Sequence, residues 1–312
     1  MQEIMFSVAI ITYNQEEYIS QTLDSILNQK HNYKYEIVVG EDCSTDNTKK
    51  IIEEYVAKYP QIIKPIYNNP NKGIIKNYFN VINNCQGKYI MECAGDDYWL
   101  PNKVNTQISF MEENKNVGMC YGKALFYEND NKKFQKKKFG TKWVKFNQLI
   151  QDNKIPALSV CIKNEIIKKY IKDINPEEKK WLMEDYPLWI WISKNSKIHF
   201  INKTFGVYRI GQDSASLAQN IEKQLAFSKN YHEIKTFFSN LYSIQLPEWN
   251  EFENLFFLCY DALRKNYSKE YQKKLCINYK KILNKNIKMK IIYYVSFSKY
   301  TFKIFMLLRN FI

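Results

Sequence analysis

The sequence lacks a glycine-rich phosphate-binding loop. Its 312 residues include only nine glycines, and neither a G-x-G-x-x-G nor a G-K-[ST] pattern follows any apolar run. Such loops hold the phosphates in dinucleotide dehydrogenases and P-loop enzymes, because glycine lets backbone N–H groups approach an anion closely. The sequence therefore argues against both classes, and any bound phosphate must be held by side chains and metal.

Arginine, histidine and paired cysteine are also scarce. Three arginines leave little for reading bases in nucleic acid, and three scattered histidines, at positions 31, 199 and 232, form no ligand cluster. The seven cysteines include no C-x-x-C pair, which indicates a reducing compartment. Because Met1–Met5 leads straight into an apolar run, we expect no signal peptide and a cytoplasmic protein.

Two adjacent carboxylates are the most informative feature of the first hundred residues. Asp96 and Asp97 follow Gly95 and an apolar run, Tyr89–Met91, that predicts a buried strand. Like charges at a strand end repel each other, and they become favourable when a divalent cation lies between them and a phosphate. The alternative is a polar loop whose acids simply face water. A matching nucleotide-sized site in the first 45 residues favours the metal-binding interpretation.

Strands and helices alternate through this region. Apolar runs rich in β-branched residues predict strands, and apolar spacing near 3.6 residues predicts the helices between them. The expected strands lie at 6–12, 35–39, 62–67 and 89–91, with helices at 15–29, after Asp46, and at 74–85. This order predicts βαβ units, and hence an α/β fold with a mostly parallel sheet flanked by helices. Ligands bind beyond the carboxyl ends of such strands, where Thr12, Asp42 and Asp96 are expected.

Five segments, taken together and in order, resemble the family 2 glycosyltransferases with the GT-A fold. They are Ser7–Asn14 (SVAIITYN), Glu41–Thr48 (EDCSTDNT), Asn71–Gly73 with Asn77, Gly87–Ile90 (GKYI) and Gly95–Trp99 (GDDYW). The G-D-D-Y-W form is most similar to the bacterial branch that builds cell-surface polysaccharide, such as capsule and lipopolysaccharide.

This resemblance implies a nucleotide-sugar site. Tyr13 would lie along the nucleobase, and Asp42 would accept a hydrogen bond from a base N–H. Asp97 would ligate Mg²⁺ or Mn²⁺ that bridges the diphosphate, and Asp96 would hold the ribose or sugar side. Packing at the strand end is the alternative for Tyr13, and helix capping is the alternative for Asp42. Further candidates for contacts near the base and the diphosphate are Thr12, Asn14 and Lys76.

A second acid pair, Glu184–Asp185, interrupts an otherwise apolar stretch from Trp181 to Trp191. Carboxylates rarely lie among apolar residues without a task. In the resembled family an E-D element before a helix supplies the general base, and Asp185 takes that position. It would remove the proton from the acceptor hydroxyl, and a wall of Trp189 and Trp191 would raise its pKa toward the working pH. A compatible alternative is an acid pair stabilised by the helix dipole.

A later segment, Val207–Ser216, resembles the family's flexible Y-R-x-H loop, which folds over the diphosphate. Gly211 stands at the position of the histidine, which removes a possible metal or phosphate ligand. Arg209 would pair with phosphate, or alternatively tie this loop to Glu184.

Positive charge is concentrated after residue 100. The first hundred residues hold 9 Lys and Arg against 13 Asp and Glu, whereas the whole chain carries a net charge of +14. This balance predicts an anionic partner for the second part of the chain. For the lysine cluster at 132–138, a solvated face is the alternative.

The last 25 residues have the spacing of an amphipathic helix, with Lys288, Lys299 and Lys303 on one side and mostly aromatic residues on the other. No uncharged run reaches the ~20 residues that a spanning helix needs. We therefore expect this segment to bind anionic lipid at the cytosolic face of the inner membrane. Packing on the catalytic domain is the alternative.

These features together predict a two-part chain. Residues 1–216 would form the GT-A catalytic domain, with a nucleotide half at about 1–115 and an acceptor half at about 116–216, and 217–312 a helical region. The expected activity is metal-dependent, inverting transfer of a hexose from a UDP-sugar to a lipid-linked or nascent surface glycan, without a nucleic-acid partner. The alternatives are a sugar-phosphate nucleotidyltransferase and a non-catalytic membrane- or RNA-binding module with a degenerate site. The nucleotidyltransferase would need a glycine-rich basic loop that Thr12–Gln15 lacks.

Overall fold

The computed structural model describes residues 3–129, 131–210 and 221–245. The chain divides into two compact units, Met1–Gly211 and Gln212–Ile312, which are treated separately. In the second unit the structure describes helix α8 (Ile221–Leu241) and the few residues after it. Gly211 and the basic segment 286–312 lie outside the described residues. No helix in the described ranges is both long and apolar enough to cross a bilayer.

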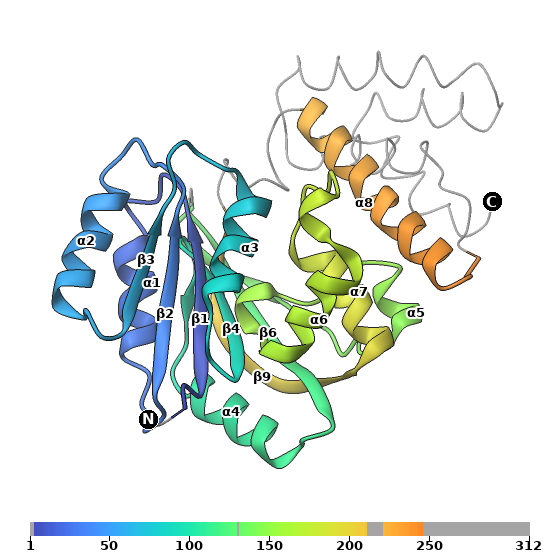
Figure 1. Cartoon of the computed structure of the whole chain (residues 1–312), viewed down its shortest axis with the longest axis horizontal. Coiled ribbons are helices and arrows are strands. Elements are labelled where there is room, and N and C mark those ends of the chain that lie inside the picture. Colours follow the sequence, from blue (N-terminus) through green and yellow to red (C-terminus); the bar gives the residue numbers. More distant parts are fainter. Residues whose placement is uncertain (1–2, 130, 211–220, 246–312) are drawn as a thin grey trace. The chain divides into compact units, whose positions relative to one another are not determined.

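The first unit is built on one nine-stranded sheet (Figure 1). Its strands are β1 (Phe6–Thr12), β2 (Tyr35–Glu41), β3 (Ile63–Tyr67), β4 (Tyr89–Ala94), β5 (Tyr98–Trp99), β6 (Val117–Glu128), β7 (Lys133–Phe139), β8 (Cys161–Lys163) and β9 (Lys197–Ile210). The spatial order is β3-β2-β1-β4-β8-β6-β9-β5, and β7 pairs with β6. The α/β prediction is confirmed.

The sheet is mixed, and the predicted parallel arrangement holds for its first half. Strand β1 pairs in parallel with β2 and β4, and β2 pairs in parallel with β3. Strand β8 runs antiparallel to β4 and β6, and β5 runs antiparallel to β9. The three residues of β8 and the two of β5 are too short to show a hydrophobic period, so the sequence pattern did not reveal them.

Helices cover the sheet of the first unit on both faces. They are α1 (Ile19–Leu27), α2 (Thr48–Lys58), α3 (Ile74–Asn84), α4 (Lys103–Glu113), α5 (Phe146–Leu149), α6 (Asn164–Ile174) and α7 (Asp185–Asn195). Right-handed crossovers put α1 and α2 on one face and α3, which packs on β1 and β2, on the other (Figure 1). Asp46 precedes Asn47, the N-cap residue of α2, and contacts the start of the helix, because its Oδ1 accepts a hydrogen bond from the Thr48 N–H (2.9 Å).

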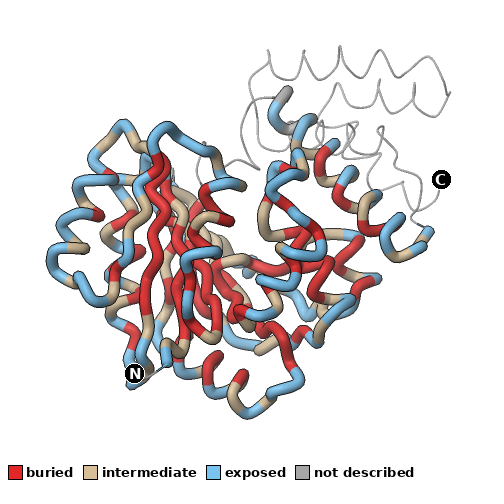
Figure 2. Tube along the Cα trace, viewed as in Figure 1, coloured by how far each residue is buried: buried red, intermediate tan, exposed pale blue. Residues whose placement is uncertain are grey.

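The central strands are buried along almost their whole length (Figure 2). Phe6, Val8 and Ile10 of β1 are fully buried, and so are Ile37 and Val39 of β2. Continuous burial follows from helices on both faces, which explains why these strands appear as unbroken apolar runs in the sequence.

A lysine is buried beside the G-D-D-Y-W segment. The Lys103 ammonium donates hydrogen bonds to Gln107 Oε1 (2.6 Å) and the Val160 carbonyl (3.0 Å), and it lies 4.3 Å from the ring centre of Trp99. Burial lowers its pKa to about 8. The Trp99 indole N–H in turn donates to the Glu92 carbonyl (3.2 Å). These contacts fix the end of the G-D-D-Y-W segment against β4 and α4.

The lysine cluster at 132–138 lies largely on β7, which pairs only with β6 among the described strands. Lys133, Lys136, Lys137 and Lys138 are all exposed. Lysines on an open sheet edge oppose pairing with a further strand from another molecule. This placement agrees with the solvated-face alternative.

Candidate active site

The carboxyl ends of β1, β2 and β4 meet at one edge of the sheet. The strand register pairs Thr12 with Glu41, and Ile11 with Ala94. The segment that begins at Asp42 and the Gly-Asp-Asp turn after β4 therefore start on either side of the end of β1. The structure brings these sequence-predicted segments together.

Asp42 organises the loop that precedes α3. Its Oδ1 accepts hydrogen bonds from Asn68 Nδ2 (2.9 Å) and the Lys72 N–H (2.8 Å), and its Oδ2 accepts one from the Gly73 N–H (2.8 Å). Gly73 is the N-cap residue of α3, with φ of 80°, so Asp42 does stabilise a helix start, although not that of α2. Since a carboxylate oxygen has two acceptor positions, Oδ2 keeps one for a ligand.

Tyr13 and Asn14 follow β1. Tyr13 is 47% exposed, so its ring is accessible to a ligand and is not packed at the strand end. Asn14 adopts a positive φ of 52°, its Oδ1 accepts from the Thr45 N–H (2.8 Å), and its own N–H donates to Ser44 Oγ (3.0 Å). Asn14 therefore shapes the loop beside Tyr13 by joining the ends of β1 and β2.

Thr12 lies close beneath the Gly-Asp-Asp turn. Its Oγ1 donates to Gln15 Oε1 (2.8 Å). A Cβ at Gly95 would clash with both of these side chains, so only glycine fits there. Gln15 also hydrogen-bonds the Asp96 carboxylate. Gln15 is a site residue that the sequence analysis missed, because a polar residue after a turn gives no distinguishing signal.

The two adjacent acids have different surroundings. Asp96 is half-buried, whereas Asp97 is 3% exposed and its Oδ1 accepts a hydrogen bond from the Arg209 N–H (2.9 Å). Burial raises the pKa of Asp96, and burial together with repulsion from Asp96 raises that of Asp97 well above its ordinary range. Asp96 is thus the acid that faces solvent, and Asp97 is anchored to the backbone of β9.

The guanidinium of Arg209 is enclosed by two tyrosine rings. Its Cζ lies 5.0 Å from the ring centre of Tyr18 and 4.9 Å from that of Tyr98. The residue is 7% exposed. Such stacking on both faces suits the planar guanidinium and would not suit lysine.

The hydrogen bonds of this guanidinium go to the protein's own α1 and Gly-Asp-Asp segments. Arg209 donates to the Asp96 carbonyl and to the side chain of Gln21. Among the described residues it forms no tie to Glu184, the pairing considered from sequence. Arg209 therefore clamps the turn that carries the acids.

The second acid pair lies at the start of α7, as predicted. Glu184 is the N-cap residue and Asp185 the first helical residue. Asp185 accepts hydrogen bonds from Asn153 Nδ2 at Oδ2 (2.9 Å) and from the Tyr186 N–H at Oδ1 (2.5 Å). Burial raises the pKa of Asp185, while the Asn153 bond opposes this rise. Burial and repulsion from Asp185 raise the pKa of Glu184 to about 8.

A third carboxyl group, that of Glu92 on β4, belongs to the same cluster. Glu92 is 5% exposed and accepts a hydrogen bond from the Tyr78 hydroxyl (2.7 Å). Burial raises its pKa to about 8, and the charges of Glu184 and Asp185 add to this shift. The predicted strand ended at Met91, one residue before Glu92, so the sequence analysis missed this residue.

Tyr208 connects the two acid pairs. Burial raises the pKa of its phenol, and the charges of Asp97, Asp96, Asp185 and Glu184 all raise it further. Both acid pairs therefore lie within electrostatic reach of one side chain on β9.

Lys76 is exposed in the first turns of α3.

The acids of the Gly-Asp-Asp turn suit a divalent cation. No point in the described ranges is surrounded by three or more His, Cys, Asp or Glu side chains. Asp96 and Asp97 nonetheless offer hard oxygen ligands, and burial raises the pKa of both, with repulsion from Asp96 adding to the rise for Asp97. A cation that they share with diphosphate oxygens would offset both penalties.

The family model for glycosyl transferase family 2 matches residues 7–171, more than half of the chain. The chain belongs to this family. The nucleotidyltransferase alternative and the degenerate binding module are therefore not retained. The matched region contains Asp42, Asp96 and Asp97.

Two similar proteins differ in how much of their length aligns with this glycosyltransferase. An uncharacterised Mycobacterium tuberculosis protein is 37% identical over 128 residues, which cover 40% of this chain and only 37% of that relative. Escherichia coli WfgD, a UDP-Glc:α-D-GlcNAc-diphosphoundecaprenol β-1,3-glucosyltransferase, is 30% identical over 220 residues, which cover 69% of this chain and 81% of WfgD.

Solved structures share the fold. S. aureus TarS in complex with UDP-GlcNAc superposes with a TM-score of 0.59 at 17% identity, covering 94% of this chain and 79% of TarS. The mannosyltransferase PcManGT from Pyrobaculum calidifontis, in complex with GDP-Man and Mn²⁺, gives a TM-score of 0.53 at 13% identity, covering 95% and 86%. This likeness confirms the predicted GT-A-like fold.

Proposed function

We propose that this family 2 glycosyltransferase moves a sugar from a UDP-sugar to a hydroxyl group of a lipid-linked or nascent surface glycan, with inversion at the sugar carbon. One observation carries the proposal: the acids at 96–97 are held at the end of β9 by the bond from the Arg209 N–H to Asp97, and the neighbouring Tyr208 lies within electrostatic reach of the second pair at 184–185 as well. A donor-side pair and a base-side pair that share one neighbour suit a reaction in which the acceptor attacks the donor between them. The acceptor class is supported by WfgD, whose name specifies a diphosphoundecaprenol-linked GlcNAc.

The donor nucleotide would bind at the ends of β1 and β2. The exposed ring of Tyr13 would stack on the base, and the remaining acceptor position of Asp42 Oδ2 would receive a base N–H. Thr12 and Asn14 would support this site by shaping its loops, as their hydrogen bonds indicate. Lys76, exposed at the start of α3, would approach the diphosphate.

Mg²⁺ or Mn²⁺ would be held at the Gly-Asp-Asp turn, where it would offset the charge that builds on the departing diphosphate. Because Asp96 faces solvent while one oxygen of Asp97 is occupied by the Arg209 N–H, we assign the direct contact to Asp96. Asp97 would orient the turn and complete the negative site. The ligand role that the sequence assigned to Asp97 stays a prediction. The variants Asp96→Asn and Asp97→Asn distinguish direct ligation by Asp96 from direct ligation by Asp97.

Asp185 would act as the general base. Its carboxylate would take the proton of the acceptor hydroxyl while that oxygen forms a bond to the anomeric carbon. The bond from this carbon to the diphosphate oxygen would break, and the nucleoside diphosphate would leave with the bonding electrons. A buried carboxyl with a raised pKa is suited to this role because its affinity for the proton is increased.

The test is a panel of nucleotide sugars. Thermal stabilisation of the full chain by UDP-sugars in the presence of Mn²⁺, followed by release of UDP when an undecaprenyl-linked glycan is added, is the expected result. Asp185→Asn should keep the stabilisation and lose the release. If no nucleotide sugar stabilised the protein with either metal, the donor assignment would be overturned. Binding to the cytosolic membrane face through 286–312 belongs to the same proposal.

A further inference from the structure

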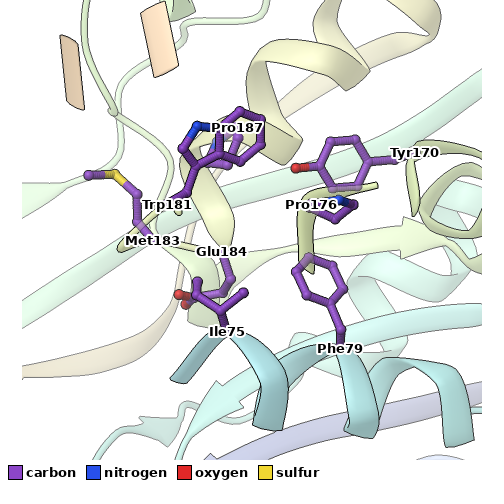
Figure 3. A pocket seen from close by; sticks show the side chains of 8 residues that line it. All are labelled: Ile75, Phe79, Tyr170, Pro176, Trp181, Met183, Glu184 and Pro187. Carbon is purple, nitrogen blue, oxygen red and sulfur yellow. The ribbon is translucent and has the colours of Figure 1, made fainter. Parts of the chain in front are cut away.

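In the described part of the chain, no lysine or arginine lines the contact between α3 and the start of α7. Figure 3 shows the side chains that surround Glu184 there, and all of them except Tyr170 are apolar. This contact therefore offers no positive charge to an anionic lipid. Charge that can hold the protein on a lipid surface lies elsewhere on the first unit.

Exposed lysines gather on β7. Four of its seven residues are lysines, and all four, Lys133, Lys136, Lys137 and Lys138, are exposed. Glu128 lies 3.7 Å from the Lys133 ammonium. Among the described residues, the other three lysines form no ion pair with an acid. Strand β7 therefore presents positive charge that no neighbouring carboxylate offsets.

The positive charge continues across the sheet toward β9. The Lys138 ammonium donates a hydrogen bond to Thr204 Oγ1 on β9 (3.1 Å). Lys123 of β6 is the register partner of Thr204, so its side chain leaves the sheet on the same face. One face of the sheet thus carries lysines from two adjacent strands, and their mutual repulsion is relieved by an anionic partner.

An exposed aromatic ring accompanies these charges. Phe134 of β7 is 52% exposed, the largest exposed fraction among the described large apolar side chains. Its ring lies edge-on to that of Tyr127, with 5.0 Å between the ring centres. Water solvates the lysines with or without this ring, whereas the ring itself gains free energy when it leaves water. Lysines beside an exposed aromatic side chain are typical of surfaces that bind the membrane interface.

The ribbon formed by β6 and β7 is fixed to the donor side of the candidate active site. Asn129, directly after β6, donates from its N–H to the Ile210 carbonyl (3.1 Å) and from its side chain to the Tyr18 hydroxyl (3.2 Å). Tyr18 is one of the two rings that enclose Arg209, which clamps the Gly-Asp-Asp turn. A lipid surface that holds this ribbon would therefore hold the donor-side acids at a fixed distance from it.

We propose that the exposed lysines of β7 and the ring of Phe134 dock on an anionic phospholipid surface. This contact is separate from the segment 286–312 and goes beyond the proposed function. Lipid phosphates complement the lysine charges, and the acyl boundary complements the ring. Nucleic acid is a less suitable partner, because the chain has only three arginines for contacts with bases.

Co-sedimentation of the full chain with phosphatidylcholine vesicles, with and without phosphatidylglycerol, tests this contact. The triple variant Lys136→Gln/Lys137→Gln/Lys138→Gln should bind the anionic vesicles roughly tenfold to hundredfold more weakly, since each lysine near such a surface contributes about fivefold in affinity. Phe134→Ala should weaken binding by about threefold to tenfold through lost burial at the acyl boundary. The triple variant should keep the melting temperature of the unaltered protein, because its three lysines are exposed.

The matched control removes the same charge from helix α6. Lys168, Lys169 and Lys172 are exposed there, and their replacement by glutamine should leave the affinity for anionic vesicles within about twofold of that of the unaltered protein. Both triple variants keep the segment 286–312, so a difference between them is due to β7. An equal loss in both variants, or no loss in the β7 variant, would overturn the inference. Weaker binding to an RNA homopolymer with unchanged vesicle binding would do the same, because the partner would then be nucleic acid.

Discussion

Asp97 Oδ1 accepts a hydrogen bond from the backbone N–H of Arg209 at 2.9 Å, across 112 residues of sequence. This bond ties the Gly-Asp-Asp turn to the end of β9, where β5 and β9 already pair through Tyr98 and Val207. The donor-side acids therefore depend on β9 for their position. Substitutions that remove the acceptor oxygen of Asp97 should disturb folding as well as binding, whereas those at Asp96 should act on binding alone.

Asp96→Asn should abolish the Mn²⁺ dependence of UDP binding without lowering the melting temperature. Asp97→Asn should keep most of the Mn²⁺ dependence and most of the stability, because an amide oxygen still accepts the Arg209 N–H. Asp97→Ala should lower the free energy of unfolding by about 1–3 kcal/mol, because it leaves a buried N–H unpaired. Calorimetry with and without Mn²⁺ and thermal unfolding measure the two effects. Loss of the Mn²⁺ effect in Asp97→Asn alone would return the ion to Asp97, as the sequence predicted.

Arg209→Lys should lower the stability of the first unit by roughly 1–3 kcal/mol, although it preserves the charge. Lysine cannot stack between Tyr18 and Tyr98, and it cannot reach the Asp96 carbonyl and Gln21 with the same planar fork. Denaturant unfolding measures the loss. Lys203→Ala, at an exposed position of the same strand, is the control and should be within about 0.5 kcal/mol of the unaltered protein.

The first half of the fold was predictable because its signals are local. The run Phe6–Thr12 is a strand with the bounds predicted for it, since apolar and mostly β-branched residues fill its centre. Asp185 was expected before a helix because its segment resembles the family's E-D element, and it is the first residue of α7. In both cases the signal lies within the element or directly beside it.

Contacts that join distant segments were not predictable. Asn153 lies in a loop and meets Asp185 only in the folded chain, so no local pattern marks it. For Arg209 the sequence suggested phosphate or Glu184 as partners, whereas the rings of Tyr18 and Tyr98 determine its position. Each pairing depends on the packing of elements whose register the sequence does not display.

Asp185→Asn should retain donor binding and lose transfer, because the amide cannot take a proton. In the unaltered protein the activity should rise with pH through a value above the ordinary aspartate range, since only the ionised base is active and burial raises its pKa. Asn153→Ala should move this rise to still higher pH by removing a hydrogen bond that stabilises the ionised form. A pH profile of kcat with saturating donor measures this shift, and an unmoved profile would contradict the assignment.

Glu92→Gln should flatten the dependence of stability on pH. The pKa of Glu92 rises from 4.5 to about 8 on folding, so the folded state binds its proton more tightly and stability falls as pH rises between these values. The size is on the order of a few kcal/mol. Glutamine remains neutral and can still accept the Tyr78 hydrogen bond. The free energy of unfolding of the variant, relative to that of the unaltered protein, should therefore be higher at pH 8 than at pH 5. Glu54→Gln, exposed on α2, should show no such gain in urea unfolding at the two pH values.

Removing residues 286–312 should release the protein from anionic vesicles and leave UDP binding intact. Each lysine near an anionic surface contributes about 1 kcal/mol, and the aromatic side of the segment adds burial at the acyl boundary. High salt should weaken binding of the full chain only in part, because the apolar contribution is not screened. If the segment instead packs on the catalytic domain, truncation would lower the melting temperature by several degrees and leave vesicle co-sedimentation unchanged. Both quantities, measured on one truncated protein beside the full chain, decide between the two roles.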